Sequence, residues 1–156
     1  MTPGQARGRG ALRFAGYAAL FDVADGARDT IRRGAFARTL AERKEPLPLL
    51  WQHRAGQRIG TVELAREDGR GLRVIARIEN TASRAARMLA ARAVSGLSFG
   101  YRARGYRRGP NGRVLEDVEL IEVSLVTHPL QHRARVHFVC GPQAPAAASA
   151  ALASLA

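Results

Sequence analysis

The sequence contains few residues of several types, and each shortage excludes a class of protein. Its 156 residues include one cysteine, Cys140, so the chain forms no internal disulfide and fits a reducing compartment. No apolar run approaches the roughly eighteen residues that a membrane-spanning helix needs. The basic residues near the N-terminus are not followed by an apolar segment, as a secretory signal would require. We therefore expect a cytoplasmic protein without a membrane partner.

Acidic residues and lysine are also scarce. The chain has 25 basic residues against 13 acidic ones, giving a formal net charge of +12, and Lys44 is its one lysine. An arginine-rich surface could bind nucleic acid or an acidic protein. However, aromatic residues are rarely interleaved with the arginines, as single-strand binders require for base stacking. The pattern favours arginines distributed over solvated faces, and we do not expect specific nucleic-acid binding.

Composition divides the chain into three parts. Residues 1–10 are rich in Gly and Arg and predict a disordered N-terminal arm. Residues 141–156 are rich in alanine and predict a tail outside the domain, either disordered or a loosely attached helix. The remaining segment, 11–140, is long enough to form one domain with a hydrophobic core.

Within that domain, strand-like segments outnumber helical ones. Strands are expected at 12–21, 47–53, 58–67, 70–79, 101–107 and 113–127, and helices at 34–44 and 81–94. Turn residues predict two hairpins, with Asp68-Gly69 as a type I′ pair in the first and Asn111-Gly112 at the tip of the second. About six strands interleaved with two helices predict an α+β, barrel-like domain rather than a doubly wound sheet.

Ser98 is the first residue that could carry chemistry. It lies in GLSFG (96–100), which matches the pattern G-x-S-x-G. In α/β-hydrolases this pattern forms a strained turn from a strand to a helix. Here a helix is expected before the motif and a strand after it, and the chain is too short for that fold. The flanking glycines would let a substrate backbone approach closely, but a structural serine in a Gly-rich turn also fits.

Two further residues could act with Ser98. His53 ends the apolar segment LPLLWQH (47–53), where period two places it on one face with Leu49 and Trp51, and a histidine satisfied by one hydrogen bond would also fit there. Glu122 lies in LIEVSLV (120–126), which is apolar on both faces. A buried carboxylate needs a partner, either an imidazole or one of the many arginines. A serine, an imidazole and an acid together form an activated nucleophile.

Several segments, in this order, resemble the prohead (capsid maturation) serine proteases of tailed bacteriophages. They are GYAALFD (16–22), RGAF (33–36), LLWQH (49–53), IGTV (59–62), GLSFGY (96–101) and LIEVSLVTHP (120–129). The resemblance implies a serine endopeptidase with Ser98 as nucleophile and His53 as base. These proteases are in turn similar to the herpesvirus assemblins, which implies an assemblin-like β-barrel of about six or seven strands with surrounding helices.

The same resemblance places Glu122 where assemblins have the third catalytic residue, a histidine, and His128 is its rival. It also places the oxyanion-hole donors at 130–133. It implies no cofactor or metal, a major capsid protein or scaffold as substrate, self-cleavage, and a location inside the assembling procapsid of the host cell. It leaves a homo-oligomer open.

Alternatives to the protease remain at this point. An inactive basic capsid-assembly or nucleic-acid-binding protein could use the same fold, and an esterase could use the same three residues. Cys140 is a further candidate nucleophile, although it is followed by Gly141-Pro142, where the ordered core is expected to end.

Overall fold

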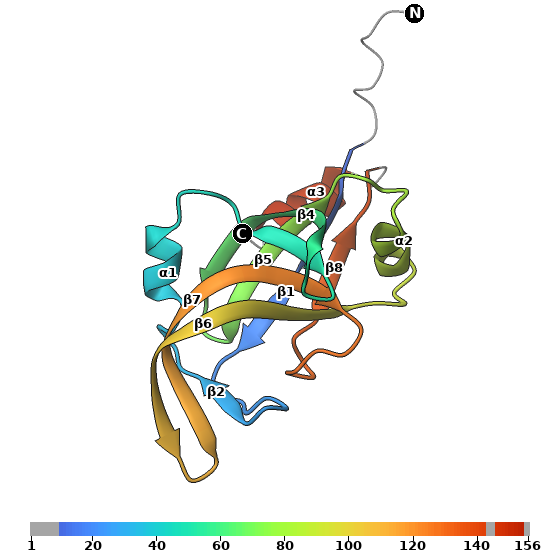
Figure 1. Cartoon of the computed structure of the whole chain (residues 1–156). Helices are drawn as coiled ribbons and strands as arrows, with labels where there is room; N and C mark the ends of the chain where they lie inside the picture. The colour runs from blue at the N-terminus through green and yellow to red at the C-terminus, as the bar shows by residue number, and fades with distance from the viewer. Residues whose placement is uncertain (1–9, 143–145, 155–156) are drawn as a thin grey trace, which may run out of the picture.

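The computed structural model describes residues 10–142 and 146–154, which contain eight strands and three helices (Figure 1). The strands are β1 (Leu12–Leu20), β2 (Asp29–Ile31), β3 (Pro48–Trp51), β4 (Arg54–Glu67), β5 (Gly71–Ile78), β6 (Gly96–Gly109), β7 (Gly112–Val126) and β8 (Val136–Cys140). The helices are α1 (Ala37–Glu42), α2 (Arg84–Ala90) and α3 (Ala146–Ser154). None of these helices is long and apolar enough to cross a membrane.

All eight strands belong to one mixed sheet. Its order is β2-β7-β3-β4-β5-β1-β8, and β6 pairs with β7 outside this path. β6 and β7 form a long antiparallel ladder and lie side by side in Figure 1. β7 also pairs in parallel with β2 near its start and with β3 near its end. The end of β7 therefore lies between β3 and the start of β6.

The sheet curls so that the start of β6 approaches the segment before β8. Leu97 N donates to Ala134 O at 2.8 Å, Val136 N donates to Ser95 O at 2.8 Å, and Gly96 forms an isolated bridge with Arg135. Because this contact is one bridge rather than a ladder, the sheet is not closed into a continuous barrel. The sequence predicted an α+β domain of six or seven strands, and the described residues form eight.

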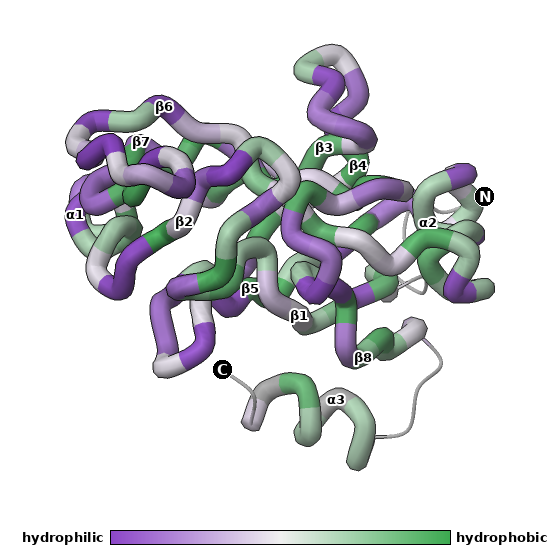
Figure 2. The backbone as a smooth tube through the Cα atoms, turned by 90° about the horizontal axis from the view of Figure 1, so that it is seen from below, coloured by the Kyte–Doolittle hydropathy of each residue, from purple (hydrophilic) through white to green (hydrophobic). Residues whose placement is uncertain are grey.

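Apolar side chains at alternate strand positions build the core inside the curled sheet. Val123 and Leu125 of β7 and Leu72 and Val74 of β5 are fully buried. Period two then turns Glu122 and Ser124 to the opposite face of β7. The outer end of the β6–β7 hairpin is hydrophilic, as Figure 2 shows.

A partly buried ion pair attaches β2 to this hairpin. Arg113 donates two hydrogen bonds to the Asp29 carboxylate, at 2.9 and 2.8 Å, and the Tyr101 hydroxyl donates a third at 2.9 Å. The bonds from Arg113 hold the pKa of Asp29 below its usual value, against the effect of burial. Burial and the bond to Asp29 raise the pKa of Tyr101 to about 12.

Several expected boundaries and turns are wrong. The β4–β5 connection is not a type I′ turn, because neither Asp68 nor Gly69 has a positive φ. Instead Asp68 Oδ1 accepts from the backbone N–H groups of Arg70 and Gly71, at 2.7 and 3.2 Å. In the second hairpin Gly109 pairs with Gly112, so residues 110–111 form the tip rather than Asn111-Gly112.

The two expected helices form but are shorter, as α1 and α2. α2 begins later than expected, because the Ser83 Oγ caps its N-terminus by accepting from Ala86 N at 3.2 Å.

The N-terminal end of the chain was expected to be disordered, and the C-terminal end to be disordered or a loosely attached helix. Residues 1–9 of the N-terminal arm lie outside the described residues. Part of the Ala-rich segment forms α3, whose Leu152 is buried with Ala15 and Ile75. Leu152, with Ala148 packed against the same cluster, supplies the apolar contact that holds the helix on the domain.

Candidate active site

Glu122 and Ser124 of β7 form the centre of the site. Glu122 is 6% exposed and Ser124 is fully buried. The Ser124 hydroxyl donates to Glu122 Oε2 at 2.6 Å, and the His53 imidazole contacts Glu122 Oε1 through Nδ1 at 2.5 Å. Within the described residues no arginine pairs with Glu122, so the expected alternative of an Arg–Glu pair is wrong. The carboxylate is instead held by an imidazole and a hydroxyl.

His53 lies in a turn rather than at the end of the expected strand. β3 ends at Trp51, which pairs with Arg54, and Gln52 and His53 form the two-residue connection to β4. Their φ angles are +52° and +60°, the positive values that a type I′ turn requires. The sequence prediction that His53 continues the alternation of Leu49 and Trp51 is therefore wrong. Each positive φ at a non-glycine residue costs on the order of 1 kcal/mol.

Hydrogen bonds from the end of β7 hold this turn in place. Gln52 N donates to Leu125 O at 3.0 Å, and His53 N donates to Ser124 Oγ at 3.1 Å. The Gln52 side chain donates to Thr127 Oγ1 and accepts from Thr127 N, both at 3.2 Å. These bonds offset the cost of the turn and fix the position of the imidazole above Glu122.

Ser98 lies on the neighbouring strand at the same level. In the β6–β7 ladder Ser98 is directly opposite Ser124, and Gly100 is directly opposite Glu122. Opposite residues share a face of the sheet, with Cβ atoms about 5 Å apart. Ser98 is 6% exposed, and its hydroxyl makes no hydrogen bond within the described residues. The structure thus brings Ser98, His53 and Glu122 to one place, around Ser124.

Gly100 explains the second glycine of the GLSFG segment. A Cβ atom at this position would lie 2.4 Å from Glu122 Oε1. The carboxylate therefore occupies the space that any other residue would fill with its side chain. This glycine makes room for Glu122, whereas the sequence analysis assigned the flanking glycines to close approach of substrate.

The other candidate residues lie elsewhere. His128 follows β7, is exposed, and makes no hydrogen bond within the described residues. Cys140 is buried at the end of β8, beside α3. Gln131, from the segment expected to form the oxyanion hole, is buried and binds Leu20 and Val23 through its side chain.

The anchored segment at 130–133 leads into Ala134, which accepts from Leu97 N next to Ser98. In the described part of the chain, no three His, Cys, Asp or Glu side chains group as a metal site would require.

The sequence analysis missed Ser124, Gln52 and Thr127 as parts of the site. A signal was available for Ser124, because a second polar residue two positions after Glu122 falls on the same face of an apolar strand. No signal identified Gln52 or Thr127, because their contact depends on how β3 aligns with β7.

Comparisons with known proteins agree on the relationship. Residues 4–146 match the sequence profile of a family described as caudovirus prohead serine protease. The prohead protease of Enterobacteria phage HK97 is 29% identical over 130 residues, which cover 79% of this chain and 58% of that protein. The chain thus spans little more than half the length of this relative.

Two solved structures share the fold at low sequence identity. The bacteriophage T4 capsid assembly protease has a TM-score of 0.60 and 13% identity, over 74% of this chain and 81% of that one. The varicella-zoster virus protease has a TM-score of 0.57 and 18% identity, over 94% of this chain and 76% of that one. These likenesses confirm the predicted assemblin-like α+β fold.

Proposed function

Because the chain belongs to the caudovirus prohead serine protease family, we propose that it is a serine endopeptidase that matures a viral or virus-like procapsid. Its nucleophile is Ser98, its general base is His53, and Glu122 is the third member. The observation that carries this proposal is the contact of His53 Nδ1 with Glu122 Oε1 at 2.5 Å. Ser98 lies beside this contact, and its hydroxyl has no hydrogen-bond partner among the described residues.

The contact with Glu122 sets the role of each imidazole nitrogen. Nδ1–H donates to the carboxylate, so Nε2 carries the lone pair that can accept the Ser98 proton. Glu122 is buried, whereas the His53 side chain is 41% exposed. The exposed side of the ring can therefore reach the reacting groups while its Nδ1 side stays fixed.

The reaction follows from this arrangement in two halves. As His53 Nε2 accepts its proton, Ser98 Oγ attacks the peptide carbonyl carbon, and a tetrahedral oxyanion forms. Backbone N–H groups in the segment 130–133, which ends beside β6, are the proposed donors to that oxyanion. His53 then gives the proton to the leaving amine as the C–N bond breaks. A water molecule hydrolyses the resulting ester by the same route.

The proposed substrate is the major capsid protein or a scaffold, together with the protease itself, inside the procapsid. The family relationship supports this substrate class. The segment joining β8 to α3 includes the exposed Pro142, and it is the proposed place for self-cleavage because α3 packs on the domain mainly through Leu152.

A fluorophosphonate probe tests the nucleophile without knowledge of the substrate. The serine oxygen displaces fluoride from phosphorus, so labelling adds a fixed mass to one residue. We expect labelling at Ser98 in the wild type and none in Ser98→Ala. The control Ser83→Ala removes a serine from the α2 cap, outside the site, and should label normally. Labelling of Ser98→Ala at the wild-type rate would overturn the assignment.

A further inference from the structure

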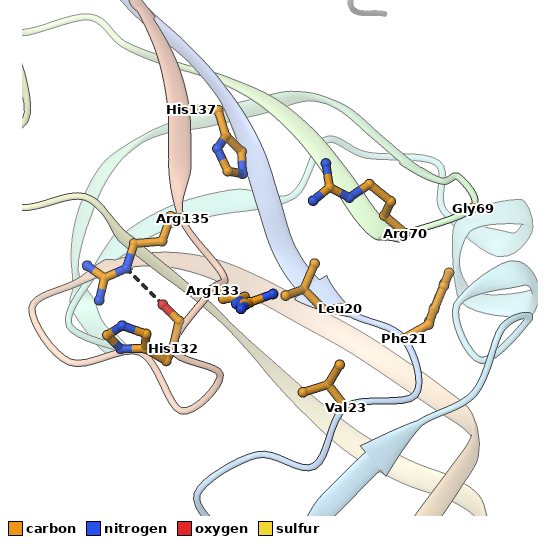
Figure 3. A pocket seen from close by; sticks show the side chains of 9 residues that line it. All are labelled: Leu20, Phe21, Val23, Gly69, Arg70, His132, Arg133, Arg135 and His137. Atoms are coloured by element: carbon orange, nitrogen blue, oxygen red, sulfur yellow. Dashed lines mark hydrogen bonds between the residues drawn. The ribbon is translucent and has the colours of Figure 1, made fainter.

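A cavity of about 680 Å³ lies between the end of β1, the β4–β5 turn and the segment before β8 (Figure 3). Three arginines line it, Arg70, Arg133 and Arg135, and no acidic residue does. Three apolar residues, Leu20, Phe21 and Val23, complete one wall. We call this cavity the arginine pocket.

The arginines of this pocket differ from many others in the chain. Seven arginines elsewhere pair with a carboxylate, namely Arg13, Arg38, Arg73, Arg77, Arg104, Arg107 and Arg113. Within the described residues, none of the three pocket arginines forms such a pair. Arg135 is held by His132 O at 2.8 Å and Ser95 Oγ at 3.2 Å, and Arg70 lies over the Tyr17 ring. In Figure 3 Arg133 extends between Arg135 and Leu20.

Concentrating unpaired cations in a concave site produces a positive potential that favours an anionic ligand. The neighbouring imidazole responds to this potential: burial first, and then repulsion from Arg70 and Arg92, lower the pKa of His137. Among the described residues, no carboxylate lines the pocket, so a ligand that brings one would be stabilised by charge-assisted hydrogen bonds.

The pocket shares a face of the sheet with the candidate active site. Arg135 pairs with Gly96 in an antiparallel bridge, so the Arg135 side chain lies on the face of the sheet to which position 96 belongs. Period two along β6 places Ser98 on that face as well. A peptide bound with one residue at Ser98 could therefore extend past the start of β6 toward Arg135.

The wall of the pocket suits a polypeptide better than a nucleic acid. Phe21, the one Phe, Tyr or Trp in its lining, is buried and packs against Phe36 with ring centroids 6.3 Å apart. It is therefore not available to stack on a base. Leu20 and Val23 instead offer apolar contact beside the guanidinium groups, which matches a segment that mixes acidic and apolar side chains.

We propose that the arginine pocket binds an acidic segment of the polypeptide substrate. This inference rests on the proposed function and specifies its substrate class. The carboxylates of the segment would pair with Arg70 and Arg133, which have no hydrogen-bond partner for their guanidinium groups among the described residues. Arg135, already fixed by His132 and Ser95, would present its remaining N–H groups.

Binding can be measured separately from catalysis in the Ser98→Ala protein. The probes are two fluorescein-labelled twelve-residue peptides of equal length, one with four glutamates and one with glutamine at those positions. Fluorescence anisotropy should show the Glu peptide binding about tenfold more tightly than the Gln peptide. The double variant Arg70→Gln/Arg133→Gln should remove this difference. The control Arg66→Gln/Arg87→Gln loses the same charge at exposed sites outside the pocket and should keep it.

Two outcomes would decide against the proposal. Equal affinity for the two peptides, or equal losses in the two double variants, would overturn it. If the pocket variant unfolds, Arg70→Lys/Arg133→Lys keeps the charges, and this variant should still prefer the Glu peptide. A twelve-nucleotide thymidine oligomer serves as a competitor for the labelled Glu peptide. If it displaces that peptide at a lower concentration than unlabelled Glu peptide does, and if the pocket variant also loses binding of this oligomer, the pocket is assigned to nucleic acid instead.

These results are distinguishable from failure of the proposed function. A wild-type protein that reacts with fluorophosphonate at Ser98 but does not distinguish the peptides keeps the function and loses the pocket. A protein that prefers the Glu peptide but never reacts at Ser98 keeps the pocket as an acidic-peptide site and loses the function.

Discussion

Replacing Ser124 with alanine should damage the site without touching the proposed triad. The Ser124 hydroxyl donates to Glu122 Oε2 at 2.6 Å and accepts from His53 N at 3.1 Å, in a fully buried position. Its loss leaves a buried carboxylate oxygen and a backbone N–H each without a partner. A hydrogen bond to a charged group contributes about 1.5–3 kcal/mol, and an ordinary hydrogen bond, such as the one from His53 N, about 0.5–1.5 kcal/mol. We therefore expect Ser124→Ala to lower the free energy of unfolding by about 2–4 kcal/mol.

The same change should slow the chemistry. Without Ser124 the Glu122 carboxylate can rotate, and the turn that carries His53 loses one of the bonds that hold its positive φ. Displacement of a reacting group by about 1 Å can cost on the order of 100-fold in rate. The assay is the second-order rate of fluorophosphonate labelling at Ser98, measured beside urea unfolding. We expect a decrease of about 100-fold in the labelling rate.

A matched control separates positioning from general loss of stability. Thr39 is also buried, and its hydroxyl accepts from the backbone N–H of Leu120 on β7 at 3.0 Å, away from the site. Thr39→Val should destabilise the fold but label at nearly the wild-type rate, and Ser124→Thr, which keeps a hydroxyl, should recover much of the rate. If Ser124→Ala labels as fast as Thr39→Val, Ser124 does not position the site and the reasoning is wrong.

Three further results should follow. Glu122→Gln should reduce the labelling rate by a few orders of magnitude with near-native folding, because glutamine keeps the shape of the side chain and removes its charge. His128→Ala should have little effect on this rate, and a larger loss in His128→Ala than in Glu122→Gln would make His128 the third member. Gly100→Ala should slow labelling although it changes no polar group, because the added Cβ would lie 2.4 Å from Glu122 Oε1. An unchanged labelling rate would show that the carboxylate can move at no cost. Asp29→Asn should weaken the loss of stability at acid pH. Arg113 lowers the folded-state pKa of Asp29, so the stabilisation from Asp29 is present above its unfolded pKa of about 3.9 and is lost as the pH falls through the folded pKa. Thermal melts with the same dependence on acid pH in the variant and the wild type would exclude this linkage.

The sequence predicted much of the fold because its strands are marked by local patterns. Apolar residues on both faces of β7 correctly predicted that Glu122 is buried and partnered, since an isolated carboxylate is costly between apolar residues. The Ser83 cap explains where α2 begins, but its position inside an Ala-rich stripe concealed that boundary. For residues 141–156 the sequence left disorder and a loosely attached helix open, and the structure has a helix at Ala146–Ser154 with Leu152 buried.

The geometry of the site was less accessible from the sequence. His53 was expected to continue a strand, since nothing in LLWQH marks Gln52-His53 as a turn with positive φ. That turn exists because β7 supplies bonds from Leu125, Ser124 and Thr127, which are more than seventy positions away along the chain. Local propensity would oppose such a turn, and tertiary contacts reverse the preference.

Co-expression with the proposed capsid or scaffold substrate, followed by intact-mass measurement, tests the central claim most directly. The wild-type chain should yield a shortened capsid or scaffold protein and a shortened form of itself, cut between β8 and α3. Ser98→Ala should leave every chain at full length while melting at nearly the wild-type temperature, because loss of a catalytic serine costs about 10⁴- to 10⁶-fold in rate. Processing by the alanine variant, or full-length chains with the wild type in assembling capsids, would contradict the account.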